Sequence, residues 1–295
     1  MATLRGTYTV TITPFTADGR RVETSVLKDF VDWQIEQGAH GLIPVASTGE
    51  FLSLTDDERR EVARTVIEQS SGRVPVLVGA GAENTWDVVR YSREAEDLGA
   101  DGVLIIPPFY STPTNDEVYR HYSTIGEAIS IPVMLYNNPA TSNIDMQPAL
   151  VAHLSEIDNV SFIKESTLDP TRVRDIIRLS GDRMAVFGGI MGYESFLNGA
   201  IGWTAVGCNL MPSAFSDMYR HCVESVDLDA AKNLYKRIVP VIELVGQHRY
   251  VSATKKALDL MGLPVGPPRP PRLPVSGEDQ AWTERVVRDL ELTFR

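Results

Sequence analysis

Eight short apolar runs are the main constraint on the fold of this chain. They occupy residues 7–13, 42–47, 74–79, 103–107, 133–137, 160–166, 185–189 and 203–208. Segments with helical periodicity lie between them, for example 55–69, 85–98, 115–129 and 170–179. The runs are nearly continuous rather than alternating, which is typical of parallel strands buried on both faces. Eight such strand–helix repeats predict an α/β fold, a closed (β/α)8 TIM barrel.

A repeated Gly-Ala-x-Gly motif supports this prediction. It occurs at residues 38–41, 99–102 and 199–202, each time between a helical segment and an apolar run. Glycine just after a helix accepts a positive φ, and the chain then enters a buried strand. The first two copies lie two strand–helix units of about 30 residues apart, a spacing suited to βα modules.

An open, doubly wound sheet is the alternative to a closed barrel. Such a sheet normally carries a glycine-rich nucleotide loop after its first strand. Here that place holds Thr13-Pro14-Phe15-Thr16, without a glycine-rich turn. We therefore reject the open sheet and the nucleotide site that it would carry.

The periodicity becomes purely helical after about residue 225. Amphipathic segments cover residues 229–245 and 251–261, a proline-rich stretch covers 266–271, and a last helix is expected over 278–292. The predicted organisation is a barrel over residues 1–225 with a C-terminal helical appendage over residues 226–295.

Composition indicates which classes of binding partner and which cellular compartment to expect. The net charge of -11 argues against nucleic acids and anionic membranes, which need a basic face. Residues 1–13 show no basic segment followed by an apolar core, so we expect a cytoplasmic protein. Cys208 and Cys222 have no companions at metal-binding spacing and are interpreted as reduced thiols. No metal and no nucleotide cofactor are expected.

Lys164 is the most informative single residue. It lies near the end of the sixth apolar run, where burial of an ammonium group favours the neutral amine that can attack a carbonyl. The alternative is a lysine that reaches the surface or pairs with a neighbouring strand. Tyr136 ends the preceding strand at a matching height, although a strand tyrosine is often simply packed. Schiff-base chemistry needs such an amine, a proton shuttle and an anchor for the substrate.

The segment Ser47-Thr48-Gly49-Glu50 offers that anchor. A hydroxyl and successive backbone N–H groups in a tight turn can bind a carboxylate, although an ordinary turn with a helix cap is the alternative. Gly188-Gly189 follows the seventh run and is compatible with a phosphate cradle or with close strand–helix packing. A phosphate- or flavin-binding barrel is therefore the alternative of another functional class. Glu165 should point away from Lys164 because side chains alternate along a strand.

Four motifs in fixed order carry a family resemblance. They are Ser-Thr-Gly-Glu at 47–50, Tyr136-Asn137-Asn138-Pro139, Ile163-Lys164-Glu165 and Gly-Pro-x-Arg-Pro-Pro at 266–271. Together they resemble the dihydrodipicolinate synthase / N-acetylneuraminate lyase family of class I Schiff-base lyases, essentially from end to end.

The resemblance implies roles for individual residues. Lys164 would form the imine with a 2-oxo acid, with no separate cofactor, and Tyr136 would shuttle protons. Ser47 and Thr48, with Gly49 in the same turn, would hold the substrate carboxylate. Gly189 and Thr204 match positions that line the pocket.

The resemblance also implies an oligomer. Tyr110 resembles the tyrosine that family members insert from a neighbouring subunit to complete a hydroxyl relay with Tyr136 and Ser47. A homo-oligomer, as a dimer of dimers, is therefore the expectation.

Two departures bear on the substrate. Dihydrodipicolinate synthases carry an arginine two residues after the proline of the Tyr-Asn-x-Pro motif, where this chain has Thr141. Without that guanidinium a bidentate carboxylate partner is lost. The turn after the seventh strand is the second departure, since its positions 190 and 191 hold Ile and Met and no acidic residue. A neutral pocket suits a hydroxylated or uncharged distal group.

We therefore expect a lyase acting on pyruvate, a hydroxylated 2-oxo acid or its cyclic imine. The reaction is either elimination, as dehydration and deamination, or retro-aldol cleavage. The pattern is similar to the branch that contains pyrroline-4-hydroxy-2-carboxylate deaminases. The alternative is a dihydrodipicolinate synthase that condenses pyruvate with aspartate semialdehyde.

Overall fold

A computed structural model describes residues 4–247 and 249–295 of the chain. Residues 1–3, part of the N-terminal stretch considered above, and His248 lie outside the described residues. The chain divides into two compact units. The first unit holds residues 4–6 and 76–204, and the second holds residues 7–75 and 205–295.

Parallel strands in sequence order form the sheet of the first unit. They are β3 (Leu77–Gly79), β4 (Gly102–Ile105), β5 (Val133–Asn137), β6 (Val160–Glu165), β7 (Ala185–Gly188) and β8 (Gly202–Ala205), whose last residue belongs to the second unit. The register pairs Tyr136 of β5 with Lys164 of β6. Nearly all of these strand residues are buried, as the continuous apolar runs predicted.

The helices of the first unit follow its strands. They are α3 (Thr85–Asp97), α4 (Asn115–Ala128), α5 (Pro139–Ser142), α6 (Pro148–Leu154), α7 (Thr171–Ser180) and α8 (Gly192–Leu197). Thr114 begins α4 with a capping box, in which Thr114 and Glu117 bond each other's backbone N–H. α5 and α6 each begin with a proline, whose missing N–H is tolerated in the first helical turn.

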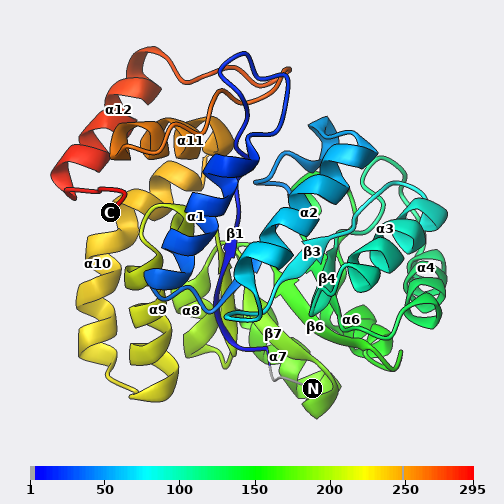
Figure 1. The fold of residues 1–295 in the computed structure, drawn as a ribbon. Coiled ribbons are helices and arrows are strands. Elements are labelled where there is room, and N and C mark those ends of the chain that lie inside the picture. Colours follow the sequence, from blue (N-terminus) through cyan, green and yellow to red (C-terminus); the bar gives the residue numbers. More distant parts are fainter. Residues whose placement is uncertain (1–3, 248) are drawn as a thin grey trace. The chain divides into compact units, whose positions relative to one another are not determined.

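The second unit combines two strands with the remaining helices. Strand β1 (Gly6–Val10, its first residue in the first unit) pairs in parallel with β2 (Gly41–Ile43). The helices are α1 (Thr24–Glu36), α2 (Asp56–Ser70), α9 (Pro212–Tyr219), α10 (Leu228–Val245), α11 (Tyr250–Met261) and α12 (Gly277–Asp289). The helices α10, α11 and α12, drawn from yellow to red in Figure 1, pack against one another.

The Gly-Ala-x-Gly motif behaves as predicted. Gly38, Gly99 and Gly199 have φ values of +87°, +89° and +97°, the left-handed region that glycine accepts without a steric penalty. The last glycine of each motif opens β2, β4 or β8. A Cβ atom at Gly202 would collide with the ring of Phe187, which explains the glycine at that strand end.

Eight parallel strands alternating with helices confirm the predicted (β/α)8 barrel with C-terminal helices. The division into a barrel over residues 1–225 and an appendage over 226–295 stays a prediction. Within residues 4–247 and 249–295, no helix combines the length and apolar character that crossing a membrane requires.

Candidate functional site

Lys164 and Tyr136 lie together at the carboxyl ends of adjacent strands in the first unit. The Lys164 side chain is buried, with the residue only 5% exposed, and its Nζ atom lies 4.1 Å from the centre of the Tyr136 ring. Tyr136 is also buried, with the residue 8% exposed. The paired register of β5 and β6 brings the two side chains to the same height. An amine and a phenol therefore share one largely enclosed environment, as the sequence predicted.

Asn138 contacts the phenol directly. Its Nδ2 atom donates to the Tyr136 hydroxyl oxygen at 3.1 Å. The Asn138 carbonyl in turn accepts the backbone N–H groups of Thr141 and Ser142, so the carboxamide comes from the first turn of α5. This contact fixes the position of the phenol oxygen, and the sequence did not predict it.

Glu165, the residue after Lys164, lies in a network of polar contacts. Glu165, the next residue, is buried and accepts Asn137 Nδ2 at 3.0 Å and the Thr167 N–H at 2.8 Å. Arg172 of α7 forms a bidentate pair with Asp145 at 2.9 and 2.7 Å. Burial by itself lowers the pKa of Arg172, but the bond with Asp145 and the nearby Glu165 charge raise it overall.

Tyr110 lies on a turn that the side chains of Glu83 and Asn143 hold by hydrogen bonds. Glu83 accepts the backbone N–H groups of Phe109, Tyr110 and Ser111 at 2.9, 2.9 and 2.8 Å. Asn143 donates its side-chain N–H to the Phe109 carbonyl at 2.9 Å. The Tyr110 side chain is 86% exposed, so it is not packed within the first unit.

The remaining predicted residues of the first unit surround the strand ends. Thr204 is buried on β8 and donates to the Gly188 carbonyl at 3.3 Å. Thr141 is exposed, and its hydroxyl donates to the Asn138 carbonyl at 3.3 Å. Gly189 donates its N–H to the Glu165 carbonyl at 2.8 Å and accepts the Trp203 indole N–H at 2.9 Å.

Ser166 is a candidate that the sequence interpretation missed. It lies two residues after Lys164 and is buried, and its hydroxyl has no hydrogen-bond partner among the described residues. A Cβ atom at Gly189 would collide with that hydroxyl. Alternation along the apolar run 160–166 was the available signal, since residues two apart face the same side of a strand.

The turn of Ser47, Thr48 and Gly49 lies in the second unit, after β2. It is bounded by two non-glycine residues in the left-handed region, Val45 at φ +60° and Glu50 at φ +58°. Such geometry is rare for a β-branched residue and persists only where the surroundings enforce it. The Thr13 hydroxyl donates to the Gly49 carbonyl at 2.8 Å. The convergence of this turn with Lys164 and Tyr136 stays a prediction.

The surroundings of Gly188 and Gly189 favour close strand–helix packing over a phosphate-binding loop. A Cβ atom at Gly188 would lie 2.8 Å from the Ser195 side chain and 3.0 Å from Gly192 Cα, both in α8. The Gly189 N–H is already donated to a carbonyl. The glycines therefore permit close contact between strand and helix.

The two cysteines are free thiols, and burial raises the pKa of both, that of Cys222 to about 11. Among residues 4–247 and 249–295, no three His, Cys, Asp or Glu side chains gather in a group that could hold a metal ion. The expected absence of a metal stays a prediction.

Comparison with known proteins identifies the family. The model of the dihydrodipicolinate synthetase family matches residues 3–290. The chain belongs to this family. It is 33% identical over 294 residues to the 4-hydroxy-tetrahydrodipicolinate synthase of Syntrophobacter fumaroxidans, covering 97% of this chain and 98% of the relative. It is 36% identical over 261 residues to the synthase of a Psychrobacter species, covering 88% and 86% respectively.

Solved structures of family members agree with this assignment. The dihydrodipicolinate synthase of Acinetobacter baumannii, solved in complex with pyruvate, has a TM-score of 0.95 at 31% identity and covers 98% of this chain and 100% of its own. The synthase of Thermotoga maritima has a TM-score of 0.93 at 26% identity, with coverage of 97% and 98%. The protein is accordingly an enzyme of this family, a class I Schiff-base lyase.

Proposed function

We propose that this enzyme forms a covalent imine between Lys164 and a 2-oxo acid, and that its substrate is a hydroxylated 2-oxo acid or the corresponding cyclic imine. The observation that carries the proposal is the buried Lys164 Nζ atom, 4.1 Å from the centre of the Tyr136 ring. A lysine amine can attack a carbonyl carbon, and a phenol at this distance is within reach of the reacting atoms.

The first half of the reaction follows from these two groups. The Lys164 nitrogen bonds to C2 of the substrate, and the C2 oxygen leaves as water after protonation. Tyr136 gives and takes the protons for these transfers. The Ser47 and Thr48 hydroxyls, with the Gly49 N–H, hold the substrate carboxylate. In the cyclic imine Lys164 displaces the ring nitrogen from C2, and that nitrogen stays on C5 as a primary amine. After loss of the C4 hydroxyl, proton transfers convert this amine into a C5 imine, which water hydrolyses to an aldehyde and ammonia.

The protonated imine then draws electrons from the bond next to C2. In elimination, a C3 proton is removed and the C4 hydroxyl leaves as water. In retro-aldol cleavage, the C3–C4 bond breaks to give an aldehyde and an enamine that is protonated to the pyruvyl imine. Water finally hydrolyses the imine and regenerates the Lys164 amine.

The distal end of the pocket favours an uncharged or hydroxylated group. Thr141 is short and its hydroxyl is engaged with the Asn138 carbonyl. The buried Ser166 hydroxyl is free to bind a substrate hydroxyl. The distal carboxylate of aspartate semialdehyde would lack a guanidinium partner at Thr141.

A dihydrodipicolinate synthase is the second candidate because similar relatives are 4-hydroxy-tetrahydrodipicolinate synthases. The synthases of Syntrophobacter fumaroxidans and of the Psychrobacter species resemble this chain at 33% and 36% identity. Such an enzyme would condense pyruvate with aspartate semialdehyde through the same Lys164 imine. Both candidate functions therefore share imine formation on Lys164. They differ in what happens next, which is cleavage or elimination of a hydroxylated substrate in one and condensation with aspartate semialdehyde in the other.

Steady-state turnover of a matched substrate panel tests the proposal. The panel contains pyruvate with aspartate semialdehyde, a 4-hydroxy-2-oxo acid, and 4-hydroxy-pyrroline-2-carboxylate, with pyruvate consumption, pyruvate release and ammonia release as readouts. We expect kcat/KM for a hydroxylated substrate to exceed that for condensation by about 100-fold or more, since a missing ionic partner has effects of that order. Efficient condensation without turnover of either hydroxylated substrate would contradict the proposal and favour the synthase.

The variant Thr141→Arg tests the reason for this preference. It should raise kcat/KM for condensation by roughly tenfold by supplying a bidentate carboxylate partner. Ala140→Arg, at the neighbouring exposed position, is the matched control and should leave condensation unchanged. An equal gain in both variants would show only a general effect of positive charge.

A further inference from the structure

The turn that carries Ser47, Thr48 and Gly49 ends in a buried carboxylate. Glu50 is 1% exposed and has the left-handed backbone geometry described above. Its Oε1 atom lies 2.7 Å from the Lys255 ammonium, and its Oε2 atom accepts the backbone N–H of Arg269 at 2.8 Å. Both partners come from the C-terminal part of the second unit, more than 200 residues further along the chain.

Lys255 is held in place by more than this ion pair. It is 2% exposed on α11, donates to the Pro267 carbonyl at 3.1 Å, and lies 4.0 Å from the centre of the Phe15 ring. A buried ammonium is tolerated only where an anion and acceptors compensate for lost water. Glu50 supplies the anion, so each charge stabilises the other.

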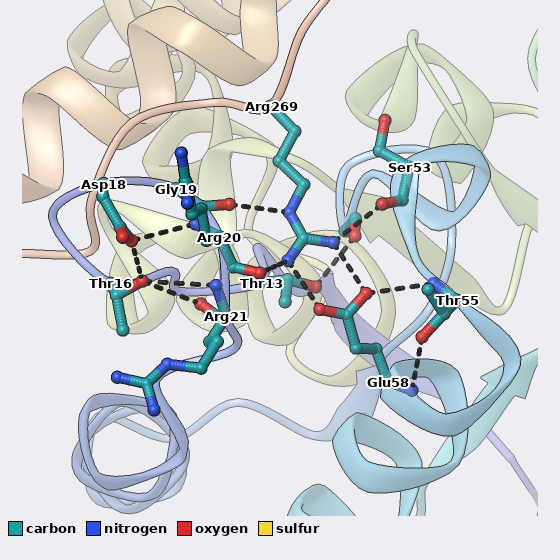
Figure 2. Close-up of polar contacts among 11 residues, drawn as sticks. Thr13, Thr16, Asp18, Gly19, Arg20, Arg21, Ser53, Thr55, Glu58 and Arg269 are labelled. Atoms are coloured by element: carbon teal, nitrogen blue, oxygen red, sulfur yellow. Dashed lines mark hydrogen bonds and ion pairs between the residues drawn. The ribbon is translucent and has the colours of Figure 1, made fainter.

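Arg269 holds the backbone around the same turn. Figure 2 shows its guanidinium donating to the carbonyls of Gly19, Arg20 and Ser53 and pairing with both oxygens of Glu58. The Glu58 carboxylate also accepts the Thr55 N–H in the capping box of α2. The Arg269 guanidinium lies 4.2 Å from the centre of the same Phe15 ring. These contacts position the Arg269 N–H that meets Glu50.

We propose that Lys255 is a positioning residue for the 2-oxo acid carboxylate site. Its ammonium neutralises Glu50, holds the strained turn of Ser47–Glu50 in shape, and keeps that turn receptive to an anion. Without a cation, the Glu50 charge would lie next to the residues that bind the substrate carboxylate and would repel it. The inference rests on the proposed function, because it assumes that this turn binds the carboxylate.

The ionisation of Lys255 gives the inference a pH dependence. Burial lowers the pKa of Lys255 to about 8, although the Glu50 charge pulls it upward and the Arg269 and Arg272 charges add to the lowering. Above that pH the ammonium becomes neutral and Glu50 loses its counter-charge. The pKa in the unfolded chain is higher, so this group contributes a rising free energy of unfolding between pH 8 and its usual value of 10.5. Because this contribution to the free energy of unfolding rises between pH 8 and 10.5, weaker substrate binding in that range would not be caused by loss of Lys255-linked stability.

Borohydride trapping with increasing pyruvate, together with kcat and KM, tests the proposal. Lys255→Met should raise the pyruvate concentration for half-maximal trapping and the KM by about tenfold or more, with a much smaller change in kcat. The double variant Glu50→Gln/Lys255→Met removes both charges and should return half-saturation to within about threefold of wild type. Lys256→Met is the matched control, because Lys256 lies on the same helix in an exposed pair with Asp259.

The pH profile keeps the test decisive if the single variant does not fold. In wild type, half-saturating pyruvate should rise by about tenfold between pH 7.5 and 9.5, and this rise should be absent from the double variant. The comparison cancels every pH dependence that the two proteins share.

Each outcome has one meaning. Unchanged half-saturation in Lys255→Met, no recovery in the double variant, or parallel pH profiles would overturn the role of Lys255. Absence of any pyruvate adduct in wild type would instead overturn the proposed function.

Discussion

The Lys164 amine meets the Tyr136 phenol because their strands are parallel neighbours in register. Parallel strands end at the same edge of a sheet, so the residues that end them converge. The Asn138 carboxamide adds a fixed donor to the phenol oxygen. The proposed chemistry therefore depends on two features, the strand register that brings Lys164 and Tyr136 together and the hydrogen bond from Asn138.

Tyr136→Phe tests the proton-shuttle role. Loss of the hydroxyl should lower kcat by roughly 10²- to 10⁴-fold, the range expected when a general acid–base is removed. Steady-state kinetics with the preferred substrate gives the measurement, and the circular dichroism spectrum should be unchanged. A decrease below tenfold would remove Tyr136 from this role.

Tyr122→Phe is the matched control for that variant. The Tyr122 hydroxyl is buried and donates to the backbone carbonyl of Ile105 at 3.0 Å, so its partner is not one of the proposed reacting groups. Its loss should lower the free energy of unfolding by about 0.5–1.5 kcal/mol, measured by urea denaturation, and leave kcat near wild type.

At the scale of elements, the turn at 109–111 depends on the Glu83 carboxylate. Burial raises the pKa of Glu83, but the Ser111 hydroxyl and the backbone N–H groups of residues 109–111 outweigh it, so the pKa lies below its usual value of 4.5. Glu83 thus remains anionic at neutral pH. The stabilisation that it gives is present above pH 4.5 and is lost as the pH falls through the lowered pKa.

Glu83→Ala should release this turn. Hydrogen exchange at the amides of residues 109–111 should accelerate by about tenfold or more, since hydrogen bonds to a charged group contribute about 1.5–3 kcal/mol. Amide exchange measured by mass spectrometry at neutral pH gives the readout. Glu117→Ala, which removes a capping carboxylate of α4, is the control and should leave those three amides protected.

Most elements were predictable from sequence because buried parallel strands read as continuous apolar runs. Gly38, Gly99 and Gly199 marked three helix ends because only glycine takes their φ values readily. The short helices α5 and α6 were not predicted individually, since four and seven residues give too few turns for a periodic signal.

The candidate site was predictable only in part. Lys164 and Tyr136 stand out because a polar residue at the end of an apolar strand is conspicuous in sequence. The contacts of Glu50 with Lys255 and Arg269 are not, because they join residues more than 200 positions apart, and no local pattern encodes that pairing. Asn138 and Glu83 were missed for a related reason, since their partners are a side chain and backbone groups fixed only by the fold.

At the scale of the whole molecule, the exposed Tyr110 is expected to complete the site of a second copy of the chain. Mixed oligomers of Lys164→Ala and Tyr110→Phe test this, because a Tyr110→Phe subunit keeps Lys164 and would receive an intact Tyr110 from its partner. After subunit exchange at equal concentrations, about a quarter of wild-type activity should return in an isologous pair. Activity no greater than the sum of the two separate variants would mean that Tyr110 acts in its own subunit or not at all.

The imine on Lys164 is tested most directly by intact-mass and peptide analysis after incubation with pyruvate and borohydride. The wild-type enzyme should gain one reduced pyruvyl group, and the modified peptide should contain Lys164. Lys164→Ala should gain none, while Lys256→Ala should be labelled like wild type. An adduct on another lysine, or no adduct with pyruvate or any hydroxylated 2-oxo acid, would contradict the mechanism proposed for this enzyme.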